Sequence, residues 1–165
     1  MTDLNYKKTT RIIEAFIDPS ARIGARSLVW HYSVIMAGVV IGDDCSVGAR
    51  TEIGKGSSIG HFTRIGSGVF LPYHSRVGCS VFIGPNVTCT DDKHPKILDP
   101  GESYTAQPPI IEDYVSIGAA AVILPGGAGG EAYLACHPNF LAIRRYNPSD
   151  FYCISVGLIG ERVTA

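Results

Sequence analysis

The chain has 165 residues, which fits a single domain that can bury a hydrophobic core. Its 14 Lys and Arg nearly balance 15 Asp and Glu, which argues against a nucleic-acid binder that relies on a basic face. Hydrophobic residues make up 45% of the chain but aromatic residues only 9%, so the core must consist mainly of aliphatic side chains. The 19 glycines exceed the usual share of about 7%.

The N-terminal residues carry scattered charges and lack the apolar stretch of a signal peptide, so we expect a cytoplasmic protein. The longest uncharged stretch, residues 114–130, contains a proline and several glycines and is too short for a spanning helix, so we expect no membrane span. The five cysteines include no C-x-x-C pair, which indicates free thiols in a reducing compartment. Cys45 is expected to be a small buried packing residue.

A strict six-residue repeat organises the first half of the chain. A small or β-branched residue stands four positions after each aliphatic residue of the repeat, and glycine often follows the aliphatic residue directly. The aliphatic positions are Ile17, Ile23, Val29, Ile35, Ile41, Val47, Ile53, Ile59, Ile65, Leu71, Val77 and Ile83, and after an interruption Ile111, Ile117 and Ile123. We expect these glycines to lie at corners that need a positive φ.

This period fits neither a helix of 3.6 residues per turn nor a simple alternating strand. One short strand and one turn take six residues, and three such sides close a triangular coil of about eighteen residues. We therefore expect an all-β solenoid over residues 17–126, after a lead-in over 1–16 and before a short irregular C-terminal segment over 127–165. Each inward aliphatic side chain should contribute about 1.5–3 kcal/mol of burial, so stacked coils stabilise one another.

The hexad pattern fails between residues 90 and 109, where acidic residues, a lysine and prolines predict a protruding loop. His94 precedes Pro95, which favours an extended backbone at the histidine. Because a free imidazole titrates near about 6.5, His94 is a candidate general base, with a solvated loop histidine as the alternative. Asp91 and Asp92 are candidates for orienting the imidazole or binding the acceptor, or they only keep the loop soluble.

Three further histidines fall at outward or corner positions of the hexads, where a surface residue is the commoner outcome. They are His31, His61 and His74. His74 is the candidate for acceptor binding among them, because it lies less than one coil before the loop.

The repeat resembles that of the hexapeptide-repeat acyltransferases, whose fold is the left-handed parallel β-helix. Residues 83–95 look like the segment that carries the catalytic histidine in galactoside and maltose O-acetyltransferases, with His94 on that histidine. The same segment is similar to G-P-x-x-x-F-T-N-D in N-acetyltransferases of nucleotide-linked amino sugars, with Asp91 and Asp92 on the Asn-Asp pair. Residues 29–48 resemble this amino-sugar group as well.

Further resemblance concerns the coenzyme. Gly118 and Ala119 match the corner whose backbone groups hold the pantetheine arm of coenzyme A, although Gly118 could be only another hexad glycine. Arg144 and Arg145 match a C-terminal segment that contacts coenzyme phosphates, although ordinary surface arginines are the alternative.

The chain departs from the family in two places. The family has a further complete coil after the position of Gly126, and in this chain that coil is lost or remodelled. Because this region often completes the coenzyme site, the affinity for coenzyme A is in question. Arg64 stands where the galactoside group has its acceptor-site asparagine, which disfavours a galactoside acceptor.

The resemblance implies an acetyl-CoA-dependent acetyltransferase that acts on an amino or hydroxyl group of a sugar, favouring a nucleotide-linked amino sugar. It implies His94 as general base, direct attack in a ternary complex, and a homotrimer with active sites between subunits. No metal, nucleic acid or membrane partner is expected. The alternatives are a non-catalytic or degraded β-helix scaffold and, less favoured, a metalloenzyme of the γ-type carbonic anhydrase kind, since no two histidines lie close in sequence.

Overall fold

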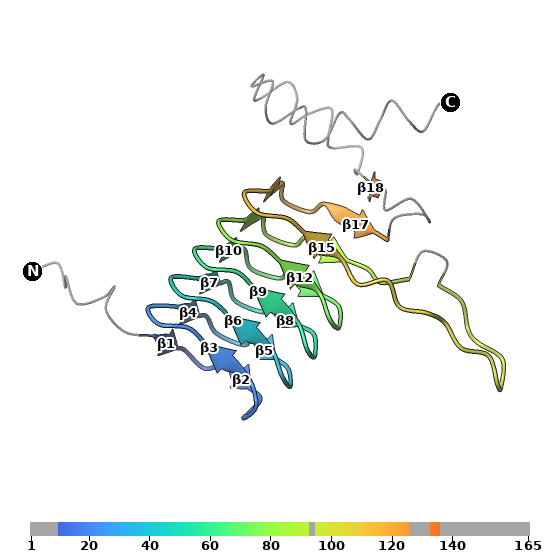
Figure 1. Cartoon of the computed structure of the whole chain (residues 1–165), viewed down its shortest axis with the longest axis horizontal. Helices are drawn as coiled ribbons and strands as arrows, with labels where there is room; N and C mark the ends of the chain where they lie inside the picture. Colours follow the sequence, from blue (N-terminus) through green and yellow to red (C-terminus); the bar gives the residue numbers. More distant parts are fainter. Residues whose placement is uncertain (1–9, 93–94, 126–132, 136–165) are drawn as a thin grey trace, which may run out of the picture.

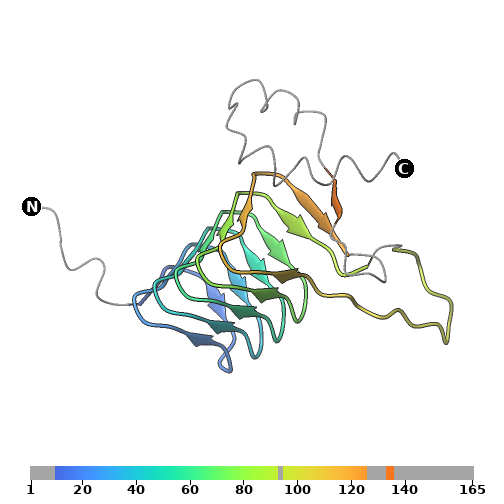
Figure 2. The same ribbon diagram turned by 45° about the horizontal axis from the view of Figure 1, so that its top comes forward.

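The computed structural model describes residues 10–92 and 95–125 and the backbone of one later strand, 133–135. The described residues form strands and turns and contain no helix. Short strands stack in parallel on three sides of a triangular prism, with one long loop standing away from it (Figures 1 and 2). No described helix could cross a membrane.

The prism has three sheets, whose strands follow one another in space from the N-terminal to the C-terminal end. Sheet A contains β1 (Arg11–Ile12), β4 (Leu28–Val29), β7 (Ser46–Val47), β10 (Arg64–Ile65), β13 (Phe82–Ile83) and β16 (Ser116–Ile117). Sheet B contains β2 (Phe16–Ile17), β5 (Val34–Ile35), β8 (Glu52–Ile53), β11 (Phe70–Leu71), β14 (Thr88–Cys89), β17 (Val122–Leu124) and β18 (Tyr133–Ala135). Sheet C contains β3 (Arg22–Ile23), β6 (Val40–Ile41), β9 (Ser58–Ile59), β12 (Arg76–Val77) and β15 (Ile110–Ile111).

Each strand pairs with the strand one coil later, so Arg64 of β10 lies opposite Phe82 of β13. Stacked positions are 18 residues apart in the regular coils and 34 apart across the loop. The expected all-β architecture of a left-handed parallel β-helix is confirmed. β1 already pairs with β4, so the paired strands extend into residues 1–16, which the sequence pattern assigned to a lead-in.

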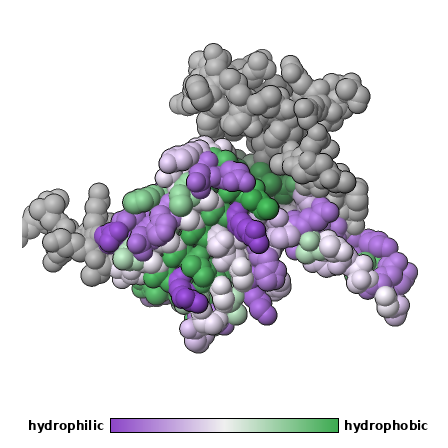
Figure 3. All heavy atoms as spheres, viewed as in Figure 1, coloured by the Kyte–Doolittle hydropathy of each residue, from purple (hydrophilic) through white to green (hydrophobic). Residues whose placement is uncertain are grey.

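The core lies where the repeat predicts it. The second residue of most strands points inward, and Ile35, Ile53 and Leu71 are 0% exposed. The small residues four positions later are buried as well, as Thr63 illustrates. Hydrophobic residues gather along the coils, whereas the protruding loop is largely hydrophilic (Figure 3).

Two of the three cysteines in the described coils, Cys45 and Cys89, lie in the core. Cys45, Cys79 and Cys89 are free thiols, and Cys45 is buried as expected. Burial raises the pKa of Cys89 to about 12, so its thiol stays uncharged at neutral pH.

The reason expected for the hexad glycines is wrong. Positive φ occurs two residues after them, for example at Phe62 with φ 61°, and Gly60 itself is not in that region. An added Cβ at Gly60 would instead lie 2.5 Å from the carbonyl carbon of Gly78 in the next coil. The hexad glycines are therefore required by the close approach of stacked backbones.

The last described coil ends differently from the others. After β17 the chain returns as β18, which pairs antiparallel, with Leu134 opposite Ile123. This strand covers the edge of sheet B in place of a further parallel strand. In the described part of the chain, sheets A and C end at β16 and β15.

Candidate functional site

The loop leaves the prism at the corner between sheets B and C, after β14, and returns to it at β15. The backbone N–H of Gln107 donates to the carbonyl of Asp91 at 2.8 Å and closes the base of the loop. Figure 2 shows the remainder extending away from the coils. The protruding loop expected over residues 90–109 is thus present.

The outer part of the loop is shaped by its own polar contacts. The Lys96 ammonium lies 3.0 Å from the Glu102 carboxylate, which also accepts the backbone N–H of Asp99 at 3.1 Å. Both contacts lower the pKa of Glu102, with Lys96 as the larger cause. The loop therefore has a defined turn at its outer end.

His74, Asp91 and Asp92 lie in successive coils at the loop-bearing corner, which we define as the turns between sheets B and C. The N–H of His74 donates to the carbonyl of Lys55 in the preceding coil at 2.8 Å. Its imidazole packs towards that coil, because an added Cβ at Gly56 would lie 2.6 Å from Nδ1. Both aspartates are half-buried in the following coil.

Three of the expected site residues thus lie at the same corner, and their role in binding stays a prediction. His94, the expected general base, lies outside the described residues, two positions beyond Asp92. Its role as general base stays a prediction.

Gly118 and Ala119 lie at the corner between sheets A and B in the last described coil. In each coil below, the residue after the strand of sheet A donates its N–H to the coil above, as Gly84 does to the carbonyl of Ile117 at 2.8 Å. No described residue takes the corresponding N–H of Gly118, and Ala119 is exposed. Arg144 and Arg145 lie outside the described residues.

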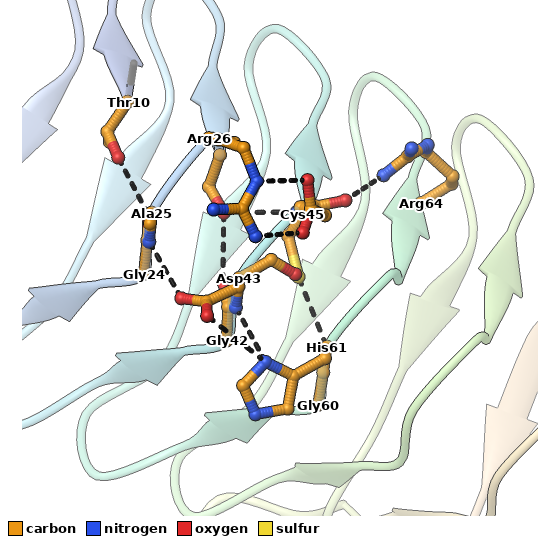
Figure 4. A network of polar contacts seen from close by, with 12 residues as sticks. Thr10, Gly24, Ala25, Arg26, Gly42, Asp43, Cys45, Gly60, His61 and Arg64 are labelled. Atoms are coloured by element: carbon orange, nitrogen blue, oxygen red, sulfur yellow. Dashed lines mark hydrogen bonds and ion pairs between the residues drawn. The ribbon is translucent and has the colours of Figure 1, made fainter. Parts of the chain in front are cut away.

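A polar network that the six-residue pattern did not reveal holds the corner between sheets C and A (Figure 4). The N–H of Ala25 donates to the Asp43 carboxylate at 2.7 Å, and the N–H of Asp43 donates to His61 Nδ1 at 2.9 Å. These partners are 18 residues apart, so the spacing of one coil was the feature of the sequence that could have predicted their contact. Asp43 and His61 serve here to join successive coils.

Asp44 adds a second connection at this corner. Two hydrogen bonds from the Arg26 guanidinium, at 2.8 and 2.5 Å, lower the pKa of Asp44. Arg64 donates to the carbonyl of Asp44. Arg64 thus has a structural partner at the position where the galactoside enzymes carry an asparagine.

The histidines of the coils are not brought together. His31, His61 and His74 lie at three different corners of the prism. Among the described residues, no group of three or more His, Cys, Asp or Glu side chains could hold a metal ion.

Two family models match parts of the chain. Residues 20–55 match the bacterial transferase hexapeptide model of six repeats, which agrees with the repeat found in the sequence. Residues 96–161 match the model of the transglycosylase SLT domain, which spans the outer loop, the last coil and much of the C-terminal segment.

Among solved structures, the chain is similar to a variant of GDP-perosamine N-acetyltransferase from Caulobacter crescentus in complex with CoA and GDP-perosamine. Sequence identity is 19%, the match covers 79% of this chain and 58% of that one, and the TM-score is 0.49. It is also similar to the acetyltransferase domain of PglB from Neisseria gonorrhoeae, with 20% identity, coverage of 72% and 55%, and a TM-score of 0.42.

The chain thus spans little more than half the length of these solved chains. A search of curated proteins finds no matching sequence.

Proposed function

We propose that the protein is an acetyl-CoA-dependent acetyltransferase that acts on an amino or hydroxyl group of a sugar. The observation that carries the proposal is the transferase hexapeptide repeat, matched over residues 20–55, in a solenoid whose coils run evenly up to an acidic loop at one corner. The segment at the start of that loop resembles the catalytic segment of sugar acetyltransferases. Asp91, Asp92 and His74 lie at its base and would bind the acceptor.

In the proposed reaction, His94 takes the proton of the acceptor nitrogen or oxygen as that atom attacks the thioester carbonyl. The carbon–sulfur bond breaks, the acetyl group joins the acceptor, and coenzyme A leaves as the thiol after protonation. Both substrates are bound together, so the protein contributes positioning and base catalysis.

The open backbone at Gly118 and Ala119 supports binding of coenzyme A at the end of the solenoid, where Arg144 and Arg145 would pair with its phosphates. We also propose a homotrimer with active sites between subunits. In that arrangement the loop of one subunit would extend towards its neighbour.

A second candidate, a transglycosylase, is favoured by the match over residues 96–161. However, the described part of residues 96–161 does not form a separate domain, because its strands pair with strands of the solenoid. β15 pairs with β12, β16 with β13 and β17 with β14. The acetyltransferase is therefore the better supported function.

The test is release of coenzyme A thiol from acetyl-CoA in the presence of amino sugars, nucleotide-linked sugars and free glycosides. The His94→Ala substitution should lower kcat/KM at least about a hundredfold, because a positioned general base accelerates a reaction by at least this factor. His31→Ala is the matched control, since His31 lies at another corner, and it should retain activity. Sedimentation of the same preparation should give the mass of a trimer.

Unchanged kcat/KM in His94→Ala would remove the histidine from the mechanism. Absence of thiol release with every acceptor, together with cleavage of glycan strands by the same preparation, would favour the transglycosylase. Absence of both activities and of acetyl-CoA binding would favour the remaining alternative, a non-catalytic β-helix scaffold.

A further inference from the structure

The second residue of each turn between sheets C and A belongs to one column along the solenoid. The members are Ala25, Asp43, His61, Cys79 and Asp113. Three backbone N–H groups of this column donate to the side chain of the next member. Ala25 donates to Asp43 at 2.7 Å, and Cys79 donates to Asp113 at 2.6 Å. Asp43 donates to His61 Nδ1 at 2.9 Å, so side chains join successive coils here.

His61 differs from the other two acceptors in its chemistry. Asp43 and Asp113 accept with carboxylates, which ordinarily stay charged down to about pH 4. An imidazole ordinarily titrates near about pH 6.5. The side chain of His61 is 54% exposed, so protons from the solvent reach the ring. Of these three connections, the one at His61 is therefore the connection that can change near neutral pH.

The hydrogen bond at His61 fixes where the ring carries its proton. A backbone N–H can only donate, so Nδ1 presents its lone pair to Asp43 and the proton of the neutral ring is on Nε2. A second proton would bind to Nδ1 and turn it into a donor that faces another donor. Protonation of His61 therefore removes the acceptor of the Asp43 N–H (Figure 4).

The same turn supplies a partner for the protonated ring. Oδ2 of Asp43 lies 3.9 Å from Nδ1 of His61, so a small movement brings the imidazolium onto this carboxylate. Arg26 remains bound to Asp44 by two hydrogen bonds and keeps these coils joined. The other titratable or charged groups around this corner are Cys45, Arg64, Cys79 and Asp113.

We propose that His61 is an acid-sensitive joint between successive coils. Neutral His61 holds the backbone N–H of Asp43, whereas protonated His61 releases this N–H and donates to the Asp43 carboxylate. Because the neutral ring makes the connection, the connection is present above the titration range of the imidazole and lost below it. The change is local, since the ion pair of Arg26 with Asp44 and the three sheets still hold the coils. This inference does not depend on the proposed acetyl transfer.

The experiment is native-state hydrogen exchange of the full chain, read as the protection factor of single amides at different pH. The protection of the Asp43 amide should fall about tenfold from about pH 7.5 to about pH 5.5, because one hydrogen bond is lost. The Cys79 amide is the internal control, since it has a carboxylate acceptor, and its protection should stay within about twofold. Nitrogen chemical shifts of His61 should show the proton on Nε2 at neutral pH.

Two variants separate the acceptor from its titration. His61→Asn keeps an acceptor, because its amide oxygen takes about the place of Nδ1, and it does not titrate. The Asp43 amide should then be protected at every pH. His61→Ala has no acceptor, so the protection should be low at every pH. His31→Asn, at the corner between sheets A and B, is the matched control and should keep the pH dependence of the wild type.

Three outcomes would overturn the proposal. The Asp43 amide could keep its protection in acid, or it could lose protection in parallel with the Cys79 amide, which would mean a general loosening of the fold. A proton on Nδ1 at neutral pH would contradict the hydrogen bond itself. Thermal unfolding at neutral pH shows which variants are folded, and the comparison of the two amides in the wild type decides the question without them.

Discussion

At the scale of single residues, the distance between stacked backbones decides which positions accept a side chain. An added Cβ would lie under 3 Å from backbone atoms of the next coil at most hexad glycines, including Gly48, Gly60 and Gly84. Left-handed φ is a separate requirement, and non-glycine residues such as Asp44 and Asn86 meet it at the corners. Steric exclusion and backbone conformation thus act at different positions of the same turn.

The two requirements can be separated by substitution. Gly60→Ala should destabilise the fold by about 3 kcal/mol or more, because the methyl group would have to displace the backbone at Gly78. Gly38→Asn should cost less than about 1 kcal/mol, because Gly38 has φ 68°, a region that asparagine tolerates, and an added Cβ would come no closer than 3.9 Å to the Cα of Gly56. Urea unfolding of both variants measures the difference, and equal losses would mean that φ is the main constraint.

At the scale of the element, a strand of two residues is held by contacts between coils. The buried hydroxyl of Thr63 joins two coils, since it donates to the carbonyl of Gly78 at 2.9 Å and accepts the N–H of Val81 at 3.2 Å. It is 0% exposed, so water does not replace either partner. Valine occupies the equivalent position at Val69 and Val81, so the site accepts a branched apolar side chain.

Thr63→Val should therefore test the hydrogen bonds with little change in shape. We expect a loss of about 1–3 kcal/mol, because buried backbone groups lose their partners. Thr63→Ser keeps the hydroxyl and should cost about 1 kcal/mol for the missing methyl group. A larger loss in the serine variant, measured by thermal unfolding, would show that packing outweighs the hydrogen bonds.

At the scale of the whole molecule, the solenoid is a one-dimensional stack in which each coil contacts only its neighbours. Stability in such a stack is the sum of the coils and the interfaces between them. A central coil has two interfaces, whereas a coil at the end of the stack has one. The effect of a core substitution should accordingly depend on its place along the axis.

Ile53→Ala should destabilise the protein by about 2–5 kcal/mol, since this side chain is 0% exposed in a central coil. Ile17→Ala should cost less than half as much, because Ile17 is only half-buried in the first coil. Denaturant unfolding with hydrogen exchange as a second probe measures both. Equal losses would contradict a stack of nearest neighbours.

The sequence by itself determined the coil, its core and the place of the loop. Those features depend on local periodicity, because a strand of fixed direction and a turn of fixed length bring every sixth residue inward. Ile35 and Leu71 lie inside for this reason, and the acidic stretch beginning at Asp91 protrudes because it breaks the pattern.

Only the tertiary structure decided which side chains meet between coils. The contact of Asp43 with His61 and the packing of Tyr73 on Gly54 depend on the register of successive coils and on the direction of each side chain. The antiparallel return of β18 is likewise absent from the repeat, since a strand's direction follows from the turn before it and the edge it covers. Periodicity describes one coil, whereas the corners where we propose binding are formed by residues of several coils at once.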